Sequence, residues 1–90
     1  MEQVYHVGNC PFCRGYGRME IIYNFPSGKC SVICEECELE FDTVSDYQNN
    51  KNGYRTLCSA WNGITRARPA FPDEIKNSEW YGLVTEELPT

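Results

Sequence analysis

The first half of the chain carries two strand-forming segments that a turn separates. Residues 18–25 and 30–33 contain isoleucine, valine, tyrosine and phenylalanine, which favour extended backbone. Residues 26–29, with the sequence PSGK, include the proline and glycine that favour a turn. The pattern therefore predicts an antiparallel hairpin over residues 18–33.

The second half of the chain is less regular. Residues 45–53 are rich in polar turn formers, so a loop or a frayed helical turn is expected there. Residues 54–68 contain two strand-like runs around Asn62 and Gly63, a dipeptide that is typical of tight hairpin turns. We expect a second hairpin in this segment, although residues 58–61 are also compatible with a helix.

Pro72 marks the expected start of a short helix. Two acidic residues follow it, and negative charge is favourable in the first turn of a helix. Ile75 and Trp80 come next at spacings compatible with helical turns, so we predict a helix over residues 73–80. Together with the strands, this predicts a small α+β fold in one domain, residues 1–90.

Four of the six cysteines form two C-x2-C pairs that are separated by twenty residues, namely Cys10 with Cys13 and Cys34 with Cys37. This spacing is typical of zinc sites, because each pair places two thiolates on one side of a tight turn. Two such turns can enclose one Zn²⁺ in a tetrahedron of sulfur atoms, which leaves no open position for catalysis. The alternative, a disulfide scaffold, requires an oxidising compartment.

Three further residues are candidates for metal or thiol chemistry. Cys30 could compete as a zinc ligand, but its spacing to Cys34 is less suitable, and we expect it to pack beside the site. Cys58 lies among apolar residues and is expected to be a buried free thiol, with a disulfide to Cys30 as the alternative. His6 is the single histidine, and we expect an ordinary surface or partly packed residue rather than a ligand.

Each C-x2-C turn is a knuckle of the kind found in zinc ribbons. The order of knuckle, hairpin and knuckle along the chain resembles the zinc-ribbon family. "CPFC" at Cys10 and "CEEC" at Cys34 carry the resemblance, although Arg14 stands where ribbon knuckles usually have glycine. The resemblance implies a zinc-ribbon β-hairpin over about residues 5–45. Residues 46–90 would then be an extension with additional strands and a short C-terminal helix. The layout is also similar to that of small bacterial zinc-ribbon proteins, some of which are immunity proteins of contact-dependent or polymorphic toxin systems.

Length and hydropathy suggest a small cytoplasmic protein. A chain of 90 residues lies near the lower size limit at which a hydrophobic core is stable without a bound metal or disulfides. A zinc ion would provide this additional stabilisation. We find no signal-like start and no apolar stretch of about 18 residues. A soluble monomer is therefore the expectation.

Acidic residues are concentrated in two segments. Residues 35–46 contain six acids and no base, and residues 73–90 contain five acids and one lysine, within a formal net charge of −5. The basic residues are scattered, which argues against a nucleic-acid surface. We expect an acidic surface that binds a basic protein, and a strand there would place the last four of its residues on one face. Its members are Glu35, Glu36, Glu38, Glu40 and Asp42.

The sequence therefore predicts a non-catalytic zinc protein that binds another protein. The resemblance to immunity proteins implies a toxin domain, often a basic nuclease, as the partner. The alternative is a zinc-ribbon accessory protein of transcription or translation that binds nucleic acid. An enzyme is not expected, because the metal position is closed and no nucleophile has a base beside it.

Overall fold

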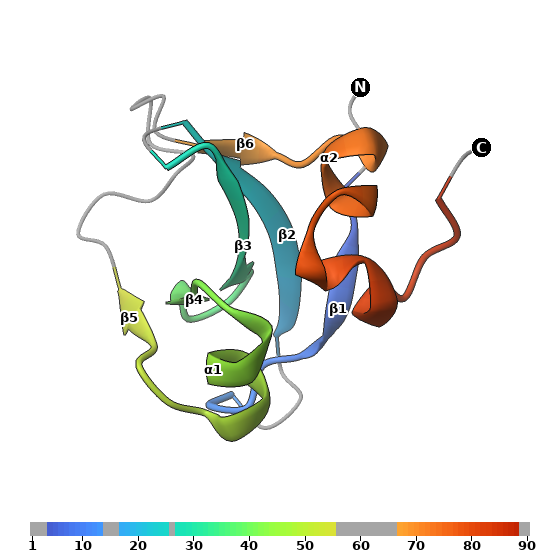
Figure 1. The fold of residues 1–90 in the computed structure, drawn as a ribbon. Coiled ribbons are helices and arrows are strands. Elements are labelled where there is room, and N and C mark those ends of the chain that lie inside the picture. Colours follow the sequence, from blue (N-terminus) through green and yellow to red (C-terminus); the bar gives the residue numbers. More distant parts are fainter. Residues whose placement is uncertain (1–3, 14–16, 26, 56–66, 89–90) are drawn as a thin grey trace.

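The computed structural model describes residues 4–13, 17–25, 27–55 and 67–88. These residues form a small α+β fold (Figure 1), whose strands and helices are β1 His6–Asn9, β2 Arg18–Asn24, β3 Lys29–Cys34, β4 Leu39–Phe41, α1 Val44–Asn49, β5 Tyr54–Arg55, β6 Ala67–Pro69, α2 Pro72–Lys76 and the 3₁₀ helix η1 Glu79–Leu83.

The strands form one antiparallel sheet in which β2 is central. The strand order is β1-β2-β3-β4-β5, and β6 also pairs with β2. β3 covers one edge of β2, while β1 and β6 lie end to end along the other edge. Between these two strands, the Ile21 amide donates to the Tyr5 carbonyl, and the Ile21 carbonyl accepts from the Ala70 amide. Segments that precede and follow the β2–β3 hairpin in the sequence therefore complete the hydrogen bonding of β2.

The predicted hairpin is confirmed as β2 and β3. Its register runs from Met19 opposite Cys34 to Asn24 opposite Lys29. Gly28 lies in the turn with φ of +67°, a conformation that glycine adopts without steric cost. The Gly28 amide donates to the Asn24 carbonyl at 2.8 Å and closes the turn. Because β3 ends at Cys34, the hairpin positions the second cysteine pair relative to the sheet.

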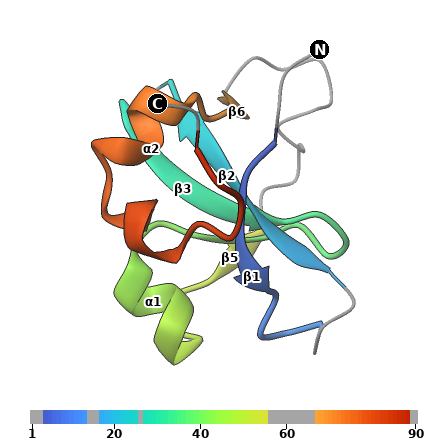
Figure 2. The same ribbon diagram turned by 90° about the vertical axis from the view of Figure 1, so that its right-hand side faces the viewer.

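The helices pack against one face of the sheet and bury its apolar side chains (Figure 2). Ile75 of α2 and Trp80 of η1 are both fully buried there, in a cluster with Ile21, Val32 and Phe41. Adjacent residues of a strand point to opposite faces. Accordingly Ile22 and Ile33 belong to a second buried cluster, with Ala67.

Two local expectations are refined by the structure. In the 45–53 segment the helical-turn alternative is confirmed as α1, where the Thr43 hydroxyl caps the N-terminus by accepting from the Asp46 amide. The predicted helix over residues 73–80 is divided into α2 and η1. Ser78 ends the continuity, because its hydroxyl accepts from the Trp80 amide and starts the second helix.

The predicted hairpin over residues 54–68 is not supported by its described ends. β5 pairs with β4, whereas β6 pairs with the edge of β2 that is opposite to β3. These two strands therefore do not pair with each other, and Figure 1 shows them well apart. The expected turn at Asn62 and Gly63 lies outside the described residues, as does Cys58.

Candidate metal centre

Each cysteine turn starts where a strand of the sheet ends. Cys10 directly follows β1, and Cys34 is the last residue of β3. Because β1 and β3 flank β2 and run in the same direction, they deliver these two cysteines to one end of the sheet. Helix α1 supports the first turn, since the Tyr47 hydroxyl donates to the Asn9 carbonyl at 3.0 Å. The second member of each pair, Cys13 or Cys37, lies three residues further on.

The four sulfur atoms are arranged as a zinc site requires. The Sγ atoms of Cys10 and Cys37 are 3.7 Å apart, as are those of Cys13 and Cys34. All four lie within 4.8 Å of one another. A zinc tetrahedron with bonds of about 2.3 Å has S–S edges of about 3.8 Å. The cysteines are free rather than disulfide-bonded, so the predicted clustering is confirmed and the residues fit one ion such as Zn²⁺.

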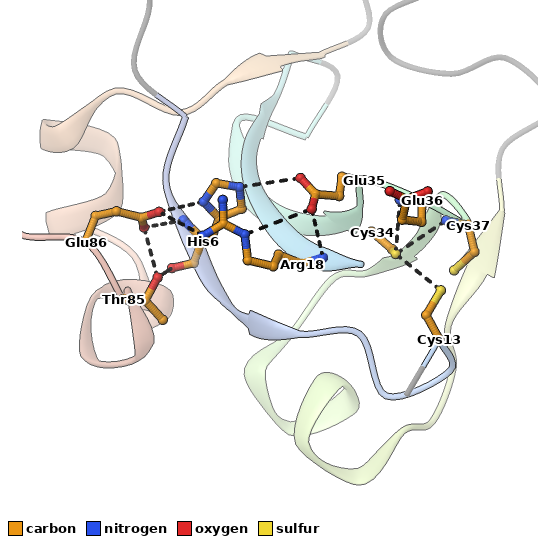
Figure 3. A network of polar contacts seen from close by, with 9 residues as sticks. All are labelled: His6, Cys13, Arg18, Cys34, Glu35, Glu36, Cys37, Thr85 and Glu86. Atoms are coloured by element: carbon orange, nitrogen blue, oxygen red, sulfur yellow. Dashed lines mark hydrogen bonds and ion pairs between the residues drawn. The ribbon is translucent and has the colours of Figure 1, made fainter. Parts of the chain in front are cut away.

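Backbone amides surround the sulfur atoms with hydrogen-bond donors. The Cys34 sulfur accepts from the amides of Glu36 and Cys37 at 3.3 and 3.4 Å (Figure 3). The Cys10 sulfur accepts from the Cys13 amide at 3.4 Å. Such donors stabilise the thiolate form that a metal needs. Four thiolates with one Zn²⁺ retain a charge of about −2, which these amides partly offset.

The thiols of the cluster influence one another's protonation. Hydrogen bonding to Cys37, together with burial, raises the pKa of Cys13. Burial alone would raise the pKa of Cys37, but hydrogen bonds from Cys13 and from the Leu39 amide outweigh it and lower the pKa to about 7. Cys37 is therefore the more readily ionised of these two thiols. A bound divalent cation replaces the remaining thiol protons.

Gly17 provides the space that the second turn needs. A Cβ atom at this position would lie 2.5 Å from the Cys34 sulfur and 3.0 Å from the Glu36 side chain. Gly17 therefore packs closely against one of the four clustered cysteines.

We therefore expect Gly17→Ala to weaken zinc binding about 10- to 100-fold, the range typical of changes next to metal ligands. The added methyl group must displace the Cys34 sulfur or the turn that carries it. Competition with a zinc chelator measures the affinity. Gly82→Ala is the matched control, because its Cβ would meet no atom within 4 Å. Equal affinities for the two variants would contradict the packing role of Gly17.

The remaining candidate residues lie outside the sulfur cluster. Cys30 is buried in the core, with its sulfur 3.7 Å from the Glu74 carbonyl, and burial raises its pKa to about 11. It is therefore a packed thiol and not one of the four clustered cysteines. His6 is also buried, more completely than the expected surface or partly packed residue, and its ring contacts Glu86.

The predicted acidic face is wrong for Glu40. β4 contains only three residues, and β3 and β5 pair with it on either side. Glu40 is fully buried, and its carboxylate accepts hydrogen bonds from Ser31 and Tyr54. Glu38 precedes the strand with φ of +62°, which breaks the alternation on which the shared face depended. Glu35, Glu36 and Asp42 are exposed, but they do not continue one strand face.

The structure instead joins the two acidic segments at a groove of about 860 Å³. The groove runs beside residues 29–31 of β3, which β4 does not reach, since β4 pairs only with Val32 and Ile33. Its charged lining consists of Asp42, Asp73, Glu74, Glu79 and Lys29. Sequence reasoning missed this groove, although the acidic composition of both segments was visible.

Comparisons with protein-family models, with curated proteins and with solved structures found no match for this chain. Among the described residues, no helix has the length and apolar character needed to cross a membrane.

Proposed function

We propose that this chain is a non-catalytic zinc protein that binds a basic protein in its acidic groove. The observation that carries the proposal is the convergence of four carboxylates and one lysine on a single groove. A concave, negatively charged surface attracts a basic partner over long distances and accelerates association. The zinc would have a structural role, because four cysteine ligands leave no position for a substrate.

The groove offers both exposed and anchored carboxylates. Asp42 and Asp73 are exposed, and Asp42 also accepts a hydrogen bond from the Tyr54 hydroxyl at 2.7 Å. Glu79 accepts from the Val44 amide, and Glu74 forms a two-pronged ion pair with Arg68. The carboxylates of Glu74 and Glu79 are held in place by these contacts, while the exposed carboxylates can contact basic side chains of a partner. This arrangement limits the entropy that the protein loses on binding.

The resemblance to immunity proteins suggests which class of partner to test. A nuclease toxin domain has a basic substrate groove, and an acidic surface that covers it would block nucleic acid. The opposing proposal, a nucleic-acid accessory role, would rely on neighbouring basic and aromatic side chains such as Arg68 and Phe71. Arg68 does stack 3.9 Å from the Phe71 ring, but Glu74 already neutralises its guanidinium. Protein binding is therefore the better-supported proposal.

Charge reversal in the groove tests the proposal once a partner has been captured by pull-down. We expect Asp73→Lys to slow association about tenfold at low salt, with little effect on melting. Asp42→Lys should slow association similarly, but it also removes the hydrogen bond from the Tyr54 hydroxyl and should lower the melting temperature. Stopped-flow association rates at several salt concentrations provide the measurement. Glu87→Lys makes the same change in net charge at an exposed site outside the groove lining, and should slow association less.

The proposal fails if the groove and control variants associate equally fast with the captured partner. It also fails if the wild-type protein binds nucleic acid tightly at physiological salt. In that case the groove reversals would strengthen binding, because they add positive charge, and the accessory role would be preferred.

A further inference from the structure

A second group of metal-ligating side chains lies on β1, on β2 and just after β3, apart from the cysteines. His6 and Glu20 are direct cross-strand partners, and Glu35 follows the end of β3. One potential ligand atom from each of these residues lies within 4.8 Å of the others. Glu20 is half-buried and Glu35 is exposed, so the group opens toward solvent.

The His6 ring is held in an orientation that suits a metal ligand. The Glu86 carboxylate accepts from the His6 backbone amide at 2.7 Å and lies 2.6 Å from Nδ1. An ionised carboxylate accepts hydrogen bonds, so Nδ1 carries the proton in this contact. The other ring nitrogen, Nε2, then points toward Glu35 (Figure 3). A carboxylate behind a histidine ring is the arrangement that commonly orients metal-bound histidines.

The Nε2 atom has a charged neighbour but no hydrogen bond. Its distance to the Glu35 carboxylate is 3.8 Å, beyond hydrogen-bond length, and the ring's hydrogen bonding among the described residues is to Glu86 alone. His6 is only 6% exposed, so bulk water has little access to the ring. Two ligands on a tetrahedral Zn²⁺ with bonds of about 2.1 Å are separated by about 3.4 Å. The observed gap is therefore close to the spacing that one shared ion produces.

The local charge also favours a cation. The carboxylates of Glu20, Glu35 and Glu86 surround the ring, and Arg18 is the basic side chain beside them. Arg18 stays 3.9 Å from Glu35 and 4.0 Å from Glu86, and its side chain is 54% exposed. It contributes loose ion pairs that a metal could displace by moving the guanidinium into solvent.

We propose that His6, Glu20 and Glu35 bind a second divalent transition-metal ion of the Zn²⁺ class, with Glu86 positioning His6. The nitrogen and carboxylate ligands suit Zn²⁺ and related ions of intermediate softness. Three protein ligands leave at least one position for water, unlike the closed cysteine site. The second ion is therefore bound more weakly and exchanges more readily than the first.

Zinc titration of the protein loaded with one zinc per chain tests this site. We expect a second zinc by equilibrium dialysis and elemental analysis, which a mild chelator removes while the first remains. Because His6 is the single histidine, its imidazole resonances report the binding directly. Cobalt titration separates the two sites, since only the cysteine site adds thiolate charge-transfer absorption. A second equivalent that enlarges that absorption would overturn the assignment.

Matched variants locate the second ion. We expect Glu20→Gln and Glu35→Gln each to weaken the second zinc at least tenfold, and Glu86→Gln to weaken it about 10- to 100-fold by releasing the ring. Glu87→Gln removes the same charge from an exposed neighbour and should leave the affinity unchanged. The first zinc and the melting temperature serve as folding controls, and Glu35→Gln decides if Glu20→Gln does not fold. Binding of one zinc only, or equal second-zinc affinities for Glu35→Gln and wild type, would overturn the proposal.

Discussion

Cys34→Ser should release the zinc and abolish cooperative unfolding. Zinc binding to small cysteine-containing domains contributes about 10–16 kcal/mol at neutral pH, and this energy is coupled to folding. The net stability of a domain is about 5–15 kcal/mol, so losing the metal removes an amount comparable with the whole. Cys34 is also the last residue of β3 and accepts two backbone hydrogen bonds at its sulfur. Elemental analysis and thermal melts followed by circular dichroism provide the measurements.

Cys30→Ser is the matched control for this loss of zinc. Cys30 lies in the same strand and is also buried, but its sulfur faces the Glu74 carbonyl and not the other cysteines. We expect the variant to keep one zinc and to melt cooperatively at a lower temperature. Wild-type protein that keeps an unchanged melt after complete removal of zinc would refute the structural role of the metal.

Trp80→Ala should destabilise the fold by about 3–5 kcal/mol, the usual cost of removing a large buried aromatic side chain. Trp80 is fully buried between η1 and the sheet. Its indole nitrogen donates to the Cys30 carbonyl at 3.2 Å, and its ring lies 6.1 Å from that of Tyr47. One side chain thus joins η1 to β3 and α1. Urea unfolding of the zinc-loaded protein measures the difference in stability.

Two further variants separate the causes of that loss. Trp80→Phe keeps much of the apolar contact but removes the indole donor, so it should cost less than Trp80→Ala. Tyr81→Ala truncates the neighbouring side chain, which is 51% exposed, and should change stability by less than about 0.5 kcal/mol. A Trp80→Ala effect as small as that of Tyr81→Ala would show that η1 contributes little to the core.

The sequence by itself determined the parts of this protein that depend on short spacings. The C-x2-C pairs and the hairpin between them were predicted correctly, because turn residues and strand formers act over a few residues. The register that opposes Met19 to Cys34 follows from that short turn. The clustering of Cys10, Cys13, Cys34 and Cys37 is then a local consequence of two turns at one end of a hairpin and its neighbouring strand.

Only the tertiary structure decided which polar residues lie inside and which acids lie together. The acidic character of Glu40 predicted an exposed position. In the structure, β4 pairs with a strand on both edges, and Glu40 is buried against Ser31 and Tyr54. The contact between His6 and Glu86 spans 80 residues, and no local periodicity encodes it. The groove likewise joins Asp42 to α2 and η1 through the packing of Trp80 on the sheet. Such contacts depend on how distant segments bury a common core, which short-range patterns do not specify.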